Sequence, residues 1–99
     1  MWYAIVAEDV ENSLEIRMAA RPAHLARLAE LQSQGKLLLA GSFPAIDSLD
    51  PGSAGFSGSL IVAEFSNLSA AKNWAEADPF VIAGVYANVA VKPFRKTLP

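Results

Sequence analysis

The sequence contains no cysteine and a single histidine. It therefore offers no disulfide, no thiolate nucleophile and no cysteine-ligated metal centre. A metal site would need carboxylates gathered around that one imidazole, and no spacing in the chain suggests such a cluster. We therefore predict no metal site. The lack of cysteine is compatible with a cytoplasmic location, because a reducing compartment leaves stability to packing alone.

Basic residues are few and scattered. Eight Lys and Arg stand against ten Asp and Glu, the formal charge is −2, and the longest basic run is Arg95–Lys96. Nucleic-acid binding needs clustered positive charge, so this class of partner is excluded. The first residues lack a basic start and reach Glu8 and Asp9 early, which argues against a signal peptide. No apolar run approaches the about 20 residues of a membrane span.

Apolar residues are abundant. They make up 53% of the 99 positions, while charged residues make up 18%, which excludes intrinsic disorder. A chain of this mass buries roughly 64% of its unfolded surface, enough for one core. We therefore predict a single domain over residues 1–99. A short chain with so many apolar residues cannot bury all of them in its own core. We therefore expect exposed apolar surface that a second subunit covers, and so a homodimer.

The pattern of apolar and turn-forming residues predicts four strands. Each is a run of β-prone residues bounded by glycine, proline or charged residues. We expect these strands over residues 2–7, 36–41, 58–65 and 85–92. Residues 43–57 hold two prolines, two glycines and three serines, which predicts a long loop between the second and third strands.

A long helix is expected between the first two strands. Asn12 and Glu15 have the spacing of a capping box at its start, and Gly35 provides the stop. Pro22 interrupts this stretch and removes a helical hydrogen bond. We therefore expect either a kink there or two consecutive helices.

A second helix follows the third strand, beginning at Asn67 or Ser69. The element order is then β-α-β-β-α-β, which predicts an α+β ferredoxin-like fold with a four-stranded antiparallel sheet and both helices on one face. The other face would stay uncovered, which favours a dimer of stacked sheets. Its apolar side chains are expected from Trp2 or Tyr3, Ile61, Val85 and Val89.

His24 is the most informative candidate for chemistry. At helical spacing it shares one face with Arg17 and Arg21 before it and with Leu28 and Leu31 after it. On this helix face, His24 would lie half-shielded between a cationic end and an apolar end. A histidine in such a place can accept and release a proton near neutral pH. The alternative is a boundary histidine satisfied by structural contacts. The two arginines form either an anion-binding pair or a solvated surface.

Asp78 also has two interpretations. Asp78–Pro79 before a short apolar stretch is typical of a helix N-cap with proline at the first helical position. Alternatively, its carboxylate accepts a hydrogen bond from His24 and orients the ring. Ser59, in Gly58–Ser59 after the long loop, offers a hydroxyl or amide to a ligand, although this dipeptide is common before strands.

Several motifs together resemble the YCII-related family of YciI-like proteins, over nearly the whole chain. The combination of a histidine in the first helix, an Asp-Pro after the second and a terminal Lys-Pro-Phe is specific. The motifs are Arg21-Pro22-Ala23-His24-Leu25, Gly35-Lys36-Leu37 running to Ala40-Gly41, Gly55-Phe56-Ser57-Gly58-Ser59, Asp78-Pro79-Phe80, Ala83-Gly84-Val85-Tyr86 and Lys92-Pro93-Phe94.

The resemblance implies a dimeric α+β barrel fold and a histidine–aspartate active site, carried here by His24 and Asp78. Relatives in that family include a dehydrochlorinase acting on a chlorinated hydroxyhydroquinone. The wider fold group includes muconolactone isomerase and monooxygenases that work without metal or cofactor. Ser42 departs from the family pattern, in which many members have proline after Ala-Gly, and this affects the expected shape of the pocket.

Two hypotheses follow from the sequence. In the first, a small enzyme without cofactor uses His24 as general acid or base and Asp78 as its partner, for elimination or isomerisation of a small, anionic, cyclic substrate. Arg17, Arg21 and Ser59 are its expected substrate-binding residues. In the second, the chain is a non-catalytic ligand-binding or dimerisation module in which the same pair only ties segments together.

Overall fold

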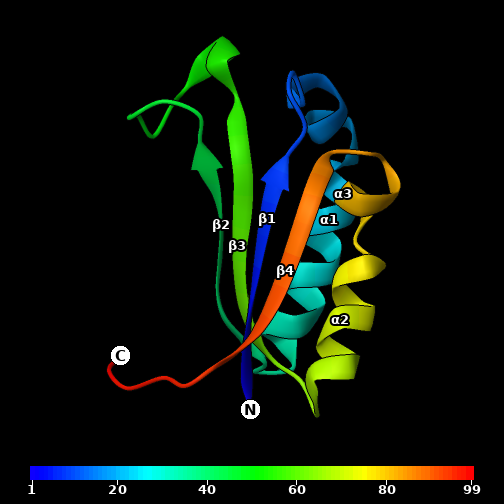
Figure 1. Cartoon of the computed structure of the whole chain (residues 1–99), viewed down its shortest axis with the longest axis vertical. Coiled ribbons are helices and arrows are strands. Elements are labelled where there is room, and N and C mark those ends of the chain that lie inside the picture. Colours follow the sequence, from blue (N-terminus) through cyan, green and yellow to red (C-terminus); the bar gives the residue numbers. More distant parts are fainter.

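The computed structural model describes all 99 residues and contains a four-stranded antiparallel sheet with helices on one face (Figure 1). The sheet order is β2-β3-β1-β4. This arrangement confirms the predicted α+β ferredoxin-like fold, and none of the helices is long and apolar enough to cross a bilayer. The elements are β1 (Trp2–Asp9), α1 (Leu14–Ser33), β2 (Leu37–Pro44), β3 (Phe56–Glu64), α2 (Leu68–Glu76), α3 (Pro79–Ile82) and β4 (Tyr86–Phe94).

Helix α1 differs from the prediction at its start and at Pro22. Its N-cap is Ser13, whereas Asn12 has a φ of 55° and lies in the preceding turn, so the predicted capping box at Asn12 is wrong. Asparagine tolerates this left-handed conformation, which an N-cap does not use. The expectation of two helices is also wrong, because α1 runs through Pro22 as one element.

The predicted α1 stripe is confirmed except at Arg21, which is exposed, and its packing explains why the helix continues through Pro22. Arg17, His24, Leu28 and Leu31 are all buried against the sheet and its neighbouring helices. In globular proteins most helix stability comes from packing of such a face, which here extends on both sides of the lost hydrogen bond.

The long loop is shorter than predicted. β2 continues to Pro44 and β3 begins at Phe56, with Phe43 paired to Gly58 across the hairpin. The longer strands form hydrogen bonds between backbone groups that, in a loop over residues 43–57, would have to bond to water. The remaining segment, residues 45–55, includes a short 3-10 turn and leaves the sheet on the side opposite the helices (Figure 1).

The core lies between the sheet and the helices. Ile5 of β1 and Ile61 of β3 pair directly, and both point toward Leu28 and Leu31 of α1 and Ala75 of α2. Because side chains alternate along a strand, every second residue of β1 points the same way, including buried Tyr3 and Ala7. This parity assigns each residue of the sheet to one of its two faces.

The opposite face carries no helix, as predicted, but its residues differ from those expected. Tyr3 and Ile61 belong to the covered face, Val85 is fully buried before β4, and Val89 pairs with Ala7 on the helix side. The sequence shows which residues of a strand share a face. Which of the two faces is covered by the helices depends on the register between strands, which the sequence does not show. Of the expected residues only Trp2 lies on the uncovered face. By register this face also carries Ala4, Val6, Leu39, Leu60 and Val62.

We predict that Gly58→Ala destabilises the protein by about 3 kcal/mol or more, the upper end for overpacking. A Cβ at Gly58 would overlap the carbonyl oxygen of Ala7, part of the β1 backbone, and would press on the Phe43 ring. Gly41→Ala in neighbouring β2 is the control, because nothing lies within 4 Å of its Cβ position. Urea unfolding of both variants checks this, and equal stabilities would contradict the packing argument.

Candidate active site

His24 and Asp78 meet although they lie 54 positions apart. The Nδ1 atom of His24 is 2.9 Å and 3.0 Å from the two carboxylate oxygens of Asp78. Both residues are buried, at 6% and 2% exposure. A carboxylate only accepts hydrogen bonds, so a contact with it places a proton on Nδ1, and in the neutral form of such a ring the lone pair is on Nε2.

Asp78 also has the predicted capping role. Its Oδ1 atom accepts a hydrogen bond from the Phe80 amide at 2.9 Å, and Pro79 occupies the first turn of α3. The two interpretations of Asp78 are therefore compatible in geometry. One carboxylate both begins α3 and contacts the imidazole of α1.

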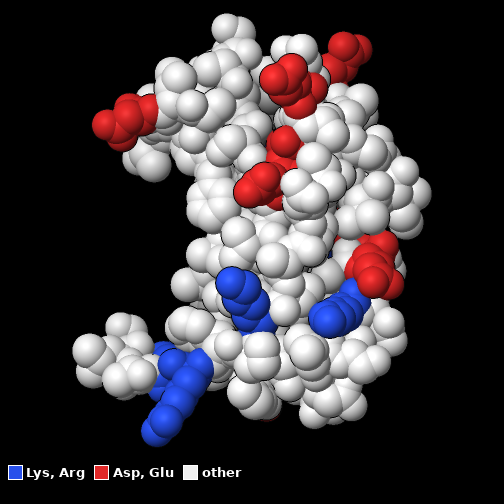
Figure 2. Space-filling model, in the orientation of Figure 1, with Lys and Arg blue, Asp and Glu red and all other residues white.

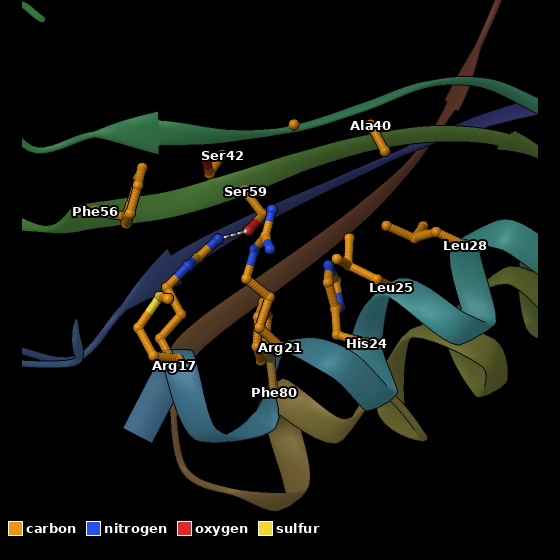
Figure 3. A pocket seen from close by; sticks show the side chains of 12 residues that line it. Arg17, Arg21, His24, Leu25, Leu28, Ala40, Ser42, Phe56, Ser59 and Phe80 are labelled. Atoms are coloured by element: carbon orange, nitrogen blue, oxygen red, sulfur yellow. Dashed lines mark hydrogen bonds between the residues drawn. The ribbon is translucent and has the colours of Figure 1, made fainter. Parts of the chain in front are cut away.

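Phe80 packs against the face of the His24 imidazole. Its ring stacks on His24 at 4.0 Å between centroids and 15° between planes, and the guanidinium carbon of Arg17 lies 4.7 Å from the Phe80 ring centre. Figure 3 shows Phe80 between these two α1 side chains. Sequence reasoning did not assign it a role, although it directly follows the Asp78–Pro79 pair.

Arg17 is held by several contacts within the protein. Its Nη1 atom donates to both oxygens of Asp9 at 2.7 Å, and its Nη2 atom donates to the Ser59 hydroxyl at 2.6 Å. Phe56 packs on the guanidinium as well. Sequence reasoning missed Asp9, but its odd position in β1 matches the buried Tyr3, Ile5 and Ala7. The charge of Arg17 is thus neutralised inside the protein.

A cavity of about 200 Å³ opens beside His24, between α1 and strands β2 and β3 (Figure 3). For comparison, an apolar cavity of about 150 Å³ holds benzene, so this space suits a single six-membered ring. Exposed Arg21 lines it and forms no hydrogen bond or ion pair within the chain, and Ser59 lines it from β3. The other lining residues are Arg17, Met18, Leu25, Leu28, Ala40, Gly41, Ser42, Phe56 and Phe80.

Tyr86 extends the group of polar side chains below the cavity. Desolvation by burial raises its pKa from 10.0 to about 12, and the neighbouring Ser59 hydroxyl opposes that shift only in part. Its hydroxyl is buried without a partner of good hydrogen-bond geometry, and its ring meets Phe80 edge-on at 5.5 Å between centroids. The phenol is therefore neutral at physiological pH.

These features agree with comparisons to known proteins. Residues 1–95 match the model of the YCII-related domain. The chain belongs to the YCII-related family. Protein YciI of Escherichia coli O6:H1 is 59% identical over 96 residues, covering 97% of this chain and 98% of that protein. An uncharacterized protein of Haemophilus influenzae is 57% identical over the same shares of both chains.

A solved structure of similar shape gives the YCII-related fold a biochemical context. It is the 5-chloro-2-hydroxyhydroquinone dehydrochlorinase of Burkholderia phenoliruptrix AC1100, in complex with 2,5-dihydroxybenzoquinone. Its TM-score to this chain is 0.85 at 26% sequence identity, and the match covers 98% of this chain and 96% of that one. The likeness therefore extends over the whole ferredoxin-like fold.

We predict that the two cavity arginines differ sharply in their effect on stability. Arg17→Gln leaves Asp9 as a buried, unpaired carboxylate, at a cost of about 3–5 kcal/mol. Arg21→Gln changes the free energy of unfolding by less than about 0.5 kcal/mol, since Arg21 is exposed and unpaired. Denaturant unfolding of the two variants measures both values. A similar cost for each would contradict the assignment of Arg17 to the internal ion pair.

The raised pKa of Tyr86 predicts that the protein loses stability at high pH. This pKa is about 12 in the folded chain against an ordinary value of 10.0, so the unfolded chain loses the phenol proton first. The contribution of Tyr86 is complete below pH 10 and declines as pH rises through the window to about 12. Unfolding free energies of wild type and Tyr86→Phe across this window isolate the effect, and parallel curves would refute it.

Proposed function

We propose that this protein is a small acid–base enzyme that needs no cofactor and uses His24 as its proton-transferring group. The observation that carries this proposal is the buried contact between His24 Nδ1 and the Asp78 carboxylate, at 2.9 Å, in the wall of a ring-sized cavity. A histidine with one nitrogen held by a carboxylate presents the other to substrate in a defined state.

The chemistry follows from this arrangement. His24 Nε2 accepts a proton from the substrate, and Asp78 stabilises the imidazolium that forms. In an elimination, the released electron pair forms a new π bond while the leaving group departs with the electrons of its own bond. In an isomerisation, the same imidazolium returns its proton to another atom of the substrate. Phe80 stacking keeps the ring in position through either sequence.

The cavity supports a small, cyclic, anionic substrate. Leu25, Leu28 and Phe56 provide apolar walls for a ring, and the cavity of about 200 Å³ limits that ring to one. Arg21 supplies the free positive charge at the entrance, whereas Arg17 acts by positioning Ser59, whose hydroxyl lines the cavity. The dehydrochlorinase of similar fold, solved with a dihydroxylated quinone, supports this substrate class.

The proposal includes a homodimer located in the cytoplasm. The face of the sheet opposite the helices carries partly exposed Val6 at 37% and Leu39 at 46%, with Phe43 and Phe94 at 39% each. Apolar surface of this kind on an open sheet is covered most simply by the same face of a second copy. The absence of cysteine fits a reducing compartment.

A non-catalytic ligand-binding module is the second candidate. Its support is the capping role of Asp78, which gives the carboxylate a structural task independent of catalysis. In that case the His24 contact would serve only to join α1 to α3. The two candidates make opposite predictions for conservative substitutions in the pair.

We predict that Asp78→Asn keeps the fold and lowers turnover by at least about 10²-fold. Asparagine caps helices about as well as aspartate, but it cannot stabilise an imidazolium. His24→Gln should be equally inactive and folded, and exposed Glu76→Gln serves as the unchanged control. The assay follows chloride release from chlorinated hydroxyhydroquinones, with proton exchange of related hydroxylated rings as the isomerase test.

The measurement separates the candidates directly. Full turnover in the Asp78→Asn variant would refute the acid–base pair. Unfolding of His24→Gln together with wild-type binding of 2,5-dihydroxybenzoquinone by Asp78→Asn would favour the module. Loss of turnover with unchanged thermal stability supports the enzyme.

A further inference from the structure

A second cavity lies between the C-terminal half of α1, the end of β3 and α2. Its volume is about 440 Å³. Pockets that bind small ligands typically span about 300–1,000 Å³, so this space is large enough for a small molecule. It shares no lining residue with the cavity beside His24. The second cavity is therefore a separate space, and the proposed acid–base chemistry makes no use of it.

Charged side chains are concentrated in the second cavity. Charged residues make up 18% of the chain, and Figure 2 shows a face on which they are few and broad areas carry none. By contrast, four of the ten residues that line the second cavity are charged, namely Arg27, Glu30, Lys36 and Glu64. Glu64 lies 3.9 Å from the amino terminus, and the other three form no ion pair. The cavity therefore holds unpaired charges of both signs.

The position of Arg27 explains why these charges stay apart. Arg27 and Glu30 are one helical turn apart on α1, a spacing at which opposite charges often pair. Here the guanidinium contacts α2 instead. Its Nη2 atom donates to the backbone carbonyl of Trp74 at 2.9 Å, and its central carbon lies 4.3 Å from the centre of the Trp74 ring. Its Nη1 atom is buried and has no hydrogen-bond partner in the chain.

Apolar side chains complete the walls of the second cavity. The rings of Phe65 and Trp74 are 5.7 Å apart between centroids and tilted by 48°, and Leu31 and Ala70 line the same space. Aromatic side chains provide large contact areas for another apolar group. The cavity therefore suits a ligand that has an apolar part as well as a charge of each sign.

We propose that the second cavity binds a free α-amino acid with an apolar side chain. The carboxylate accepts hydrogen bonds from Arg27, and the ammonium donates to Glu30, one turn further along α1. The apolar side chain lies against Phe65 and Trp74. Because Nη1 of Arg27 is buried, the guanidinium turns toward the cavity when the ligand binds, and the carboxylate supplies the partner that this nitrogen lacks.

The two signs of charge make the ligand class specific. A simple anion would meet the carboxylate of Glu30, and a simple cation would meet Arg27 and Lys36, all of which line the same space. Only a ligand with both charges has a partner for each and leaves none facing a like charge. In an α-amino acid both groups are attached to one carbon, which matches the adjacent positions of Arg27 and Glu30 on α1.

Three ligands with the same side chain test the charge requirement. They are L-phenylalanine, 3-phenylpropionate, which lacks the ammonium, and 2-phenylethylamine, which lacks the carboxylate. Each is titrated into the full chain by isothermal titration calorimetry. Phenylalanine should bind at least about tenfold more tightly than either analogue, because each analogue loses one charged hydrogen bond. No binding of phenylalanine, or equal binding of an analogue, would overturn the proposal.

Substitutions locate the site on α1. Glu30 is exposed, so Glu30→Gln should keep the fold, weaken phenylalanine binding at least about tenfold and leave the affinity for 3-phenylpropionate no lower. Arg27→Gln should weaken phenylalanine binding to a similar extent and spare 2-phenylethylamine. Exposed Glu15→Gln, on the same helix outside the cavity, is the matched control. Unchanged phenylalanine binding by Glu30→Gln would refute the site, whatever the stability of Arg27→Gln.

An arginine of the first cavity provides the remaining control. Arg21→Gln removes the free cation beside His24 and should leave phenylalanine binding unchanged, because Arg21 does not line the second cavity. Loss of binding in this variant would place the amino acid in the first cavity and overturn the inference. Binding is measured without turnover, so this result is independent of the acid–base assay.

Discussion

The buried carboxylate of Asp78 is the constraint on which the site depends. Such a group is costly away from water unless hydrogen-bond donors surround it. It accepts from the Phe80 amide at 2.9 Å and contacts His24 Nδ1 at 2.9 Å and 3.0 Å. The capping bond places Phe80 against the imidazole, and Phe80 also packs on Arg17. One side chain thus starts α3, selects the tautomer of the ring and contributes to the position of the internal arginine.

The sequence predicted those features that depend on local pattern. The strands, the buried stripe of α1 and the Asp78–Pro79 cap follow from periodicity and from preferences at helix ends. The failures on the sheet involve register. Nothing local shows that Tyr3 faces the helices, because this depends on pairing between distant segments. The His24–Asp78 contact was expected from the family resemblance and is confirmed, but local pattern could not show it because the residues lie 54 positions apart. Asn12 failed for another reason, since asparagine suits a left-handed turn as well as a cap.

Arg17 and Arg21 show why identical residues one helical turn apart need a structure to tell them apart. Both lie on the same side of α1 and both line the cavity. Arg17 forms an ion pair with Asp9 at the end of β1, and the two side chains are only 5% and 1% exposed. The charge of Arg17 is therefore neutralised within the protein. Arg21 lies beyond the reach of that carboxylate. The cavity therefore keeps one free cation, and the anionic substrate of the proposed function rests on it.

The end of β1 links the two faces of the sheet. Glu8 and Asp9 are adjacent, yet alternation sends the first to the uncovered face and the second to the buried ion pair with Arg17. The register shift that follows Glu8 pairs Asp9 with Tyr86. It therefore brings these two polar side chains to the same end of the sheet. A one-residue slip of β1 would exchange these roles, leaving Arg17 without its carboxylate and the uncovered face without Glu8. The same register therefore determines both the electrostatics of the cavity and the residues that the uncovered face presents.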